Sequence, residues 1–213
     1  VSRQTRDALN VFTATLAEKG PQLERLNPPD FSLETVWETY GNVLDMELGV
    51  HTPKLYRLAA YLFRLQPLMV FPYSYEKYLK VLTRRDQLVS RMEAFLDDYD
   101  VWIAPVSRTE AFEHIEPESY RGPFPVYEEP VEVDAQPLDY WEANGSYTVG
   151  LNLTGHPVVV VPVGFTQEGL PIGAQIVGAR WDDARLLVIA QQLFDAAGSF
   201  RHPPGFREPP PGS

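Results

Sequence analysis

The sequence NLTGHPVVVVPVGFTQEGLPIGAQIVGA, residues 152–179, contains the longest run of β-branched residues in the chain, Val158 to Val161. An apolar run of this length, preceded by Gly155 and Pro157, is typical of a strand buried on both faces. A turn at residues 167–169 separates it from a second apolar run, residues 172–177. The pattern predicts a sheet hairpin over residues 157–179, with a connection of about six or seven residues, at the centre of the core.

The composition is that of a globular protein. The chain has 213 residues, of which 44% are hydrophobic and 22% are charged. The formal net charge of −11 argues against nucleic acid as a partner, because an acidic surface repels phosphates. There is no cysteine, which excludes disulfides and thiolate sites within the chain. We find no membrane-helix run and no signal peptide, and therefore expect a cytoplasmic protein with no membrane partner.

Helical periodicity dominates residues 1–98. Apolar residues recur at helical spacing over residues 2–19, from residue 33 for about four turns, over residues 54–66 and over residues 75–98. Ser2 and Ser32 are candidate N-caps for the first two of these helices. Gly20, followed by proline, is expected to end the first helix.

The pattern changes in the second half of the chain. Residues 100–105 are predicted to form a short buried strand, and residues 106–138, with five prolines and an excess of acids, an irregular acidic loop. Residues 140–154 are a candidate helix, and residues 182–197 are predicted to form a last helix that Gly198 closes. A proline-rich tail, residues 199–213, follows. The chain is thus predicted to be an α/β domain over residues 1–198, a mixed β-sheet flanked by helices.

Residue types and spacing alone reveal no catalytic constellation. Ser74 and Lys77 have the S-x-x-K spacing that places an amine one helical turn from a hydroxyl, but the companion motifs are missing, and the start of a helix is the favoured interpretation. The four histidines lack metal-ligand spacing: His114 lies in the acidic segment, and His156 is interpreted as a packed residue. No dinucleotide-binding or phosphate-loop glycine pattern is present. We therefore predict neither a metal nor a cofactor.

Two blocks carry a family resemblance. Residues 155–165, GHPVVVVPVGF, are followed by residues 169–178, GLPIGAQIVG, and both are preceded by Tyr147-Thr148 and Asn152-Leu153. This order closely resembles the C-terminal region of amidase signature hydrolases, which has an F-T-x-x-x-N-L-x-G-x-P pattern, a Val/Ile-rich strand and a G-L-P-x-G-x-Q-x-x-G block. The resemblance covers about residues 145–197 strongly and residues 1–30 and 100–106 more weakly.

The resemblance implies part of the amidase signature fold and hydrolysis of carbon–nitrogen amide bonds by a Ser-Ser-Lys triad. The Gly/Ser-rich region that carries this triad in the family has no counterpart in the chain, so the resemblance assigns no catalytic residue here. Acyl transfer needs an activated nucleophile, a base and an oxyanion hole, and the isolated chain is therefore expected to be inactive. The implied partners are an N-terminal amidase half, in the same or a separate chain, and a small amide substrate.

The same resemblance implies that this portion completes the sheet and lines part of the substrate pocket. The candidate pocket residues are Tyr140, Trp141, Tyr147, Thr148 and Asn152, whose aromatic rings suit an apolar or aromatic amide. In the amidase subunits of glutaminyl-tRNA amidotransferases, an acid that holds the glutamine amine stands two residues before the F-T pair. Gly145 stands at that position here, which argues against glutamine as the donor.

Two other functions remain open at this point. The chain could be a non-catalytic half-domain that holds a partner through its acidic loop and proline-rich tail. It could also be an independent hydrolase that uses Ser74 and Lys77. A half-sheet leaves an open edge and uncovered apolar faces, so the isolated chain is expected to form a homodimer or to aggregate.

Overall fold

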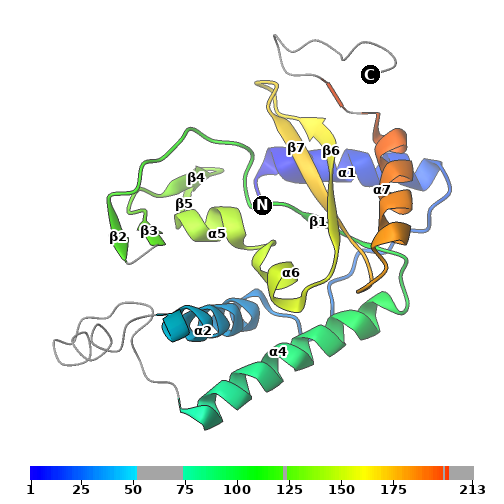
Figure 1. The fold of residues 1–213 in the computed structure, drawn as a ribbon. Helices are drawn as coiled ribbons and strands as arrows, with labels where there is room; N and C mark the ends of the chain where they lie inside the picture. The colour runs from blue at the N-terminus through cyan, green and yellow to red at the C-terminus, as the bar shows by residue number, and fades with distance from the viewer. Residues whose placement is uncertain (52–73, 122–123, 199, 202–213) are drawn as a thin grey trace, which may run out of the picture.

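The computed structural model describes residues 1–51, 74–121, 124–198 and 200–201. Six helices and seven strands have bounds in these ranges (Figure 1). The helices are α1 (Arg3–Glu18), α2 (Leu33–His51), α4 (Tyr75–Leu96), α5 (Tyr140–Gly145), α6 (Val149–Thr154) and α7 (Asp183–Ala197). The strands are β1 (Trp102–Pro105), β2 (Ser119–Arg121), β3 (Phe124–Val126), β4 (Val131–Val133), β5 (Gln136–Leu138), β6 (Val158–Phe165) and β7 (Pro171–Val177).

The core of the fold is a three-stranded antiparallel sheet in the order β1-β7-β6. The predicted hairpin is confirmed, because β6 and β7 pair along their whole length, and β1 pairs with the other side of β7. Their connection, residues 166–170, is shorter than the six or seven residues expected. It is tightened by a hydrogen bond from Thr166 N to Leu170 O (2.8 Å) and by Gly169, whose φ of +87° favours glycine.

Helices α1 and α7 cover one face of the sheet (Figure 1). Phe12 and Leu16 of α1 pack with Leu186 and Leu193 of α7 on the inward-facing side chains of the two long strands. The Ser2 hydroxyl oxygen accepts from Thr5 N (3.2 Å), which confirms the predicted N-cap of α1. The last helix also begins and ends as predicted, with Gly198 in the left-handed conformation at its C-terminus.

Helices α6 and α4 cover the opposite face only in part, and α2 packs on these two helices. Leu151 of α6 packs with Met92 and Leu96 of α4 on Val177. Beyond α6 the same face is open, and Val160 is 55% exposed. The expectation that the valine run is buried on both faces is therefore wrong at this position, because β6 lies at the edge of the sheet and α6 reaches only its first residues.

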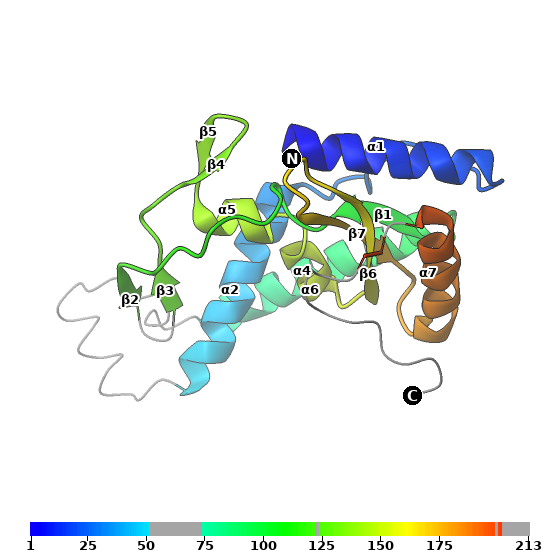
Figure 2. The same ribbon diagram turned by 90° about the horizontal axis from the view of Figure 1, so that it is seen from above.

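The segment 106–138 is more ordered than the irregular loop that was predicted. It contains two short hairpins, β2–β3 and β4–β5, which lie on the side of the molecule away from α7 (Figure 2). Val131 and Val133 of β4 face the core of this region, next to Ala143. Pro125 and Pro137 each sit in a strand of a two-stranded hairpin, where an edge position tolerates a missing N–H group. The count of prolines was therefore a poor guide to order.

Residues 140–154 form two short helices, α5 and α6, instead of one. Most other predicted elements are confirmed: the first helix, the helix capped by Ser32, the long helix from Tyr75 and the short strand before residue 106. The predicted helix 54–66 and most of the tail, residues 202–213, lie outside the described residues. None of the helices in the described part of the chain has the length and hydropathy of a membrane span.

Candidate functional site

The five candidate pocket residues lie on one continuous stretch of chain. Tyr140 and Trp141 form the first turn of α5, Tyr147 and Thr148 lie in the turn that joins α5 to α6, and Asn152 is an exposed residue of α6. Asp139 positions the first pair, because its carboxylate accepts from Trp141 N (2.8 Å) and Glu142 N (3.2 Å).

The structure places Tyr140 in an aromatic cluster. Its ring stacks on that of Tyr127, with centroids 3.7 Å apart, and meets Trp141 and Phe112 edge-on at 5.5 Å and 6.1 Å. Burial, followed by a hydrogen bond with Tyr140, raises the pKa of the Tyr127 hydroxyl above its ordinary value. The aromatic cluster, Phe112, Tyr127, Tyr140 and Trp141, forms a rigid apolar surface with polar hydroxyl edges.

Phe112 and Tyr127 were not among the sequence-predicted site residues. Both lie in the segment that was expected to be irregular, and a loop assignment offers no reason to single out an aromatic side chain. Residues 124–127, FPVY, show no alternation of apolar and polar side chains that would have indicated the strand that leads to Tyr127.

Tyr147, Thr148 and Asn152 lie outside the aromatic cluster, and the last two are fixed by local hydrogen bonds. The Thr148 hydroxyl donates to Gly145 O (3.3 Å), and Asn152 N donates to Thr148 O (3.0 Å). Within the described ranges, no ring contact joins Tyr147 to the cluster. The structure thus brings Tyr140 and Trp141 together and leaves the other three candidates as a separate turn and helix.

A buried glutamine and an arginine hold this turn. Gln175, which is 3% exposed, lies in β7, and its Nε2 donates to Pro105 O (2.7 Å) and to Tyr147 O (3.4 Å). On the other side, Arg108 donates from its backbone N to Ala143 O (2.9 Å) and from Nε to the Ser146 hydroxyl (3.0 Å). The chain segment after β1 and the centre of β7 are therefore both anchored to the candidate pocket residues.

Gly145 lies against an aromatic ring. A Cβ atom at this position would be 3.1 Å from Cη2 of Trp37 and 3.2 Å from its Cζ2, closer than ordinary van der Waals contact. The space that an acidic side chain would need is thus occupied by the indole ring. This packing gives a physical reason for the glycine at position 145.

His156 is buried and uncharged. Its Nδ1 lies 3.0 Å from the Thr154 hydroxyl, and its Nε2 is buried without a hydrogen-bond partner. Burial, opposed by Glu93 and reinforced by Arg180, lowers the pKa of His156 to about 4. These contacts agree with the interpretation of His156 as a packed residue.

The S-x-x-K motif has a structural role in the described chain. The Ser74 hydroxyl oxygen accepts from Lys77 N (3.1 Å) and forms the N-cap of α4, as the favoured interpretation predicted. The His114 side chain is exposed, and its Nδ1 lies 3.4 Å from Oε1 of Glu116. No group of three or more potential metal ligands occurs in the ranges that the structure describes.

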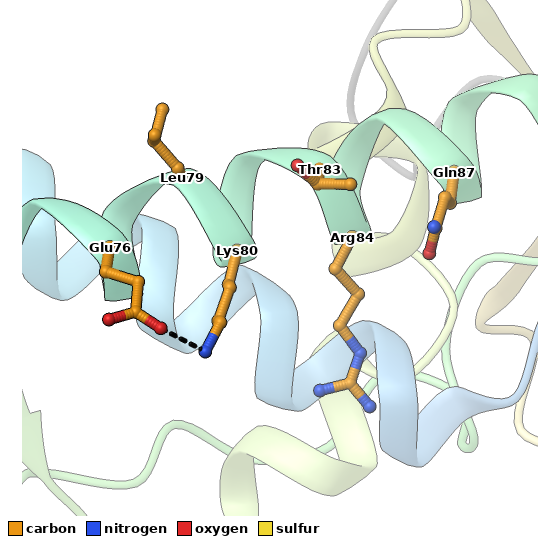
Figure 3. A pocket seen from close by; sticks show the side chains of 6 residues that line it. All are labelled: Glu76, Leu79, Lys80, Thr83, Arg84 and Gln87. Carbon is orange, nitrogen blue, oxygen red and sulfur yellow. Dashed lines mark hydrogen bonds and ion pairs between the residues drawn. The ribbon is translucent and has the colours of Figure 1, made fainter.

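A shallow hollow of about 410 Å³ lies on α4, away from these residues. Its six lining side chains all come from this one helix, and they include the exposed ion pair Glu76–Lys80 (Figure 3). A hollow formed by one face of a single helix cannot enclose a substrate, so we assign it no catalytic role.

Comparisons with known proteins agree with the fold. The Amidase family model matches residues 2–187. A glutamyl-tRNA(Gln) amidotransferase subunit of Brevibacillus brevis is 31% identical over 127 residues, which is 60% of this chain and 22% of that protein. Its counterpart in Psychrobacter sp. is 54% identical over 44 residues, which is 21% of this chain and 9% of that protein.

Solved structures extend the likeness over nearly the whole chain. A bacterial aryl acylamidase of the amidase signature family superposes with a TM-score of 0.59 and 18% identity over 95% of this chain and 44% of that one. A 6-aminohexanoate cyclic dimer hydrolase superposes with a TM-score of 0.62 and 20% identity over 92% of this chain and 42% of that one. The chain thus spans less than half the length of these structures. Because the family model covers most of its residues, the protein belongs to the amidase signature family and contains a partial amidase domain.

Proposed function

We propose that the chain is the C-terminal portion of an amidase that hydrolyses carbon–nitrogen amide bonds. The match of the Amidase family model over residues 2–187 supports the amidase part of this proposal, and the order of the GHPVVVVPVGF and GLPIGAQIVG blocks supports the C-terminal part. The Ser-Ser-Lys triad lies in an N-terminal half outside residues 1–213. In this assignment, residues 1–198 form one domain portion that completes the sheet, and residues 199–213 form a tail.

The open parts of the sheet support a missing N-terminal half. In the described chain, β6 is the edge strand on one side of the sheet, and Val160 of this strand exposes its apolar side chain. Val11 on α1 is also exposed, at 66%. An edge strand is stabilised when another segment packs against it, and the N-terminal half is the segment we assign both to the β6 edge and to the exposed side of α1.

In this proposal the aromatic cluster and the Tyr147–Thr148 turn line the substrate pocket, together with Asn152. The stacked rings of Tyr127 and Tyr140 favour an apolar or aromatic amide. The Trp37 ring beside Gly145 supports a donor other than glutamine, although several relatives are named as glutamyl-tRNA(Gln) amidotransferase subunits.

The test is labelling with a fluorophosphonate, which reacts with activated serines. The 213-residue chain alone and the same chain joined to its N-terminal half are labelled, digested and mapped by mass spectrometry. We expect a label on a serine outside residues 1–213 and none on the chain alone. A label on Ser74 of the isolated chain would instead support the independent hydrolase.

A binding module is the second candidate, and the exposed Tyr120 favours it. This side chain is 67% exposed on β2, in the acidic segment 106–138. If the chain holds a partner there, Tyr120→Ser will release a protein that the unmodified chain retains in a pull-down. Tyr75→Ser, at an exposed tyrosine of α4, is the matched control. Equal retention by both variants would remove this candidate.

A further inference from the structure

Gln175 connects three segments that are distant in sequence. Its Nε2 carries two N–H groups, and each faces a backbone carbonyl: Pro105 O at 2.7 Å and Tyr147 O at 3.4 Å. Pro105 ends β1, and Tyr147 lies in the turn between α5 and α6. Because the side chain is 3% exposed, water has little access to replace these bonds.

The chemistry at this position favours an uncharged side-chain amide. Both partners are acceptors, so the side chain between them has to donate twice from one nitrogen. A carboxylate of the same length offers no donor, and methionine fills a similar volume with no donor at all. Lysine and arginine also donate more than once, but each would place an unpaired charge at this buried position. The hydrogen bonds therefore favour glutamine here.

We propose that Gln175 is a positioning residue of the substrate pocket. It sets how far the turn with Tyr147 and Thr148 stands from the sheet, and thereby which acyl groups the amidase accepts. This inference rests on the proposed function, in which that turn lines the pocket. The Arg108 contacts to Ala143 and Ser146 hold the start of the same turn, so Gln175 controls its far end.

The test compares Gln175→Met with Gln87→Met in the amidase with both halves present. Gln87 is an exposed residue of α4, far along the chain from the turn, and serves as the control. The probes are p-nitroacetanilide and its bulkier phenylacetyl analogue. We expect Gln175→Met to raise KM for the phenylacetyl probe about tenfold and to leave kcat within about twofold. The reason is that the substitution weakens binding of the substrate and of the transition state equally and leaves the triad in place. Gln87→Met is expected to change neither constant.

A second variant separates positioning from a general loss of packing. Gln175→Glu has no donor as a carboxylate but regains one O–H donor when it is protonated. Its KM for the phenylacetyl probe is therefore expected to fall toward that of the unmodified enzyme as the pH is lowered. Gln175→Met has no titrating group and is expected to show no such recovery. Equal KM values for the Gln175 variants and the unmodified enzyme would overturn the inference.

Hydrogen exchange distinguishes failure of this inference from failure of the proposed function. If the unmodified enzyme hydrolyses neither probe and takes up no fluorophosphonate, the proposed function fails. The anchoring by Gln175 is then judged from amide exchange of residues 147–149. Exchange about tenfold faster in Gln175→Met than in Gln87→Met supports the anchoring, and equal rates overturn it.

Discussion

Gly145 shows how one absent side chain constrains the site. The Trp37 ring fills the space beside its Cα, whereas a Cβ placed at Gly41 on α2 would meet nothing within 4 Å beyond its own stretch of helix. The two glycines therefore respond in opposite ways to the same substitution. In an open helical position, alanine is favoured over glycine because it loses less backbone entropy.

We expect Gly145→Ala to lower the free energy of unfolding and Gly145→Asp to lower it further, by about 1–3 kcal/mol, because the ring has to move. Gly41→Ala is the control and is expected to raise the free energy of unfolding by roughly 0.5–1 kcal/mol. Urea denaturation followed by tryptophan fluorescence measures all three. A stable Gly145→Asp variant would show that the pocket can accept an acid at this position.

The buried His156 predicts a pH dependence of stability. Its pKa falls from 6.5 to about 4 on folding, so protonation favours the unfolded chain. The stability that the neutral ring contributes is complete above about pH 6.5 and is lost as the pH falls toward 4, by up to roughly 3 kcal/mol. We expect the His156→Gln variant to lack this loss of unfolding free energy at low pH. The His114→Gln variant, changed at an exposed histidine, is expected to show the same loss as the unmodified chain. Urea denaturation at several pH values between about 4 and 7 measures both, and parallel dependences in the two variants would contradict the prediction.

At the scale of elements, α4 joins two clusters. Leu88 packs with Val36 of α2 and with α6, and Met92 packs one turn further on against the sheet. The helix thus supports α6, which follows the candidate pocket turn. Its apolar stripe was visible in the sequence, but the identity of its partners was not.

We expect Leu88→Ala to lower the free energy of unfolding by about 2–4 kcal/mol, because it leaves a cavity among α2, α4 and α6. Leu79→Ala on the same helix is the control, since Leu79 is 43% exposed, and its effect is expected to be within about 0.5 kcal/mol. Thermal and urea unfolding measure both. Equal losses would mean that the α4 packing differs from that described.

At the scale of the whole molecule, the sheet lacks a neighbour on the β6 side of the described chain. Val160, which lies in this edge strand, is 55% exposed. The backbone groups of an edge strand readily pair with a second strand. The arrangement predicts that the isolated chain associates with itself, whereas the chain with its N-terminal half does not do so through this edge.

We expect Val160→Lys to shift the isolated chain toward monomer in sedimentation velocity at high concentration, because a charge on an edge strand disfavours edge-to-edge pairing. Val188→Lys is the control, since Val188 is 58% exposed on α7, a helix that offers no strand edge for pairing. If the unmodified chain is already a monomer at high concentration, the assignment of β6 as the seam between two halves loses its support.

Part of this architecture could be predicted from local patterns. The valine run and the second apolar run predicted the β6–β7 hairpin, and helical spacing predicted α1, α4 and α7, because backbone preference and side-chain period act over a few residues. The same reasoning failed for residues 106–138, where prolines and acids concealed two hairpins. It also failed for Val160, since burial depends on which segment covers a strand.

The sequence by itself determined the hairpin, most helix boundaries and the resemblance to amidases, because these are properties of contiguous residues. Only the tertiary structure decided which residues meet: Tyr127 stacks on Tyr140, and Gln175 reaches Pro105, 70 positions away, and Tyr147, 28 positions away. A side-chain amide can donate to any carbonyl within reach, and its partners depend on how separate segments pack. Local preferences carry no information about that choice, whereas the packed sheet and helices leave one arrangement that satisfies both donors.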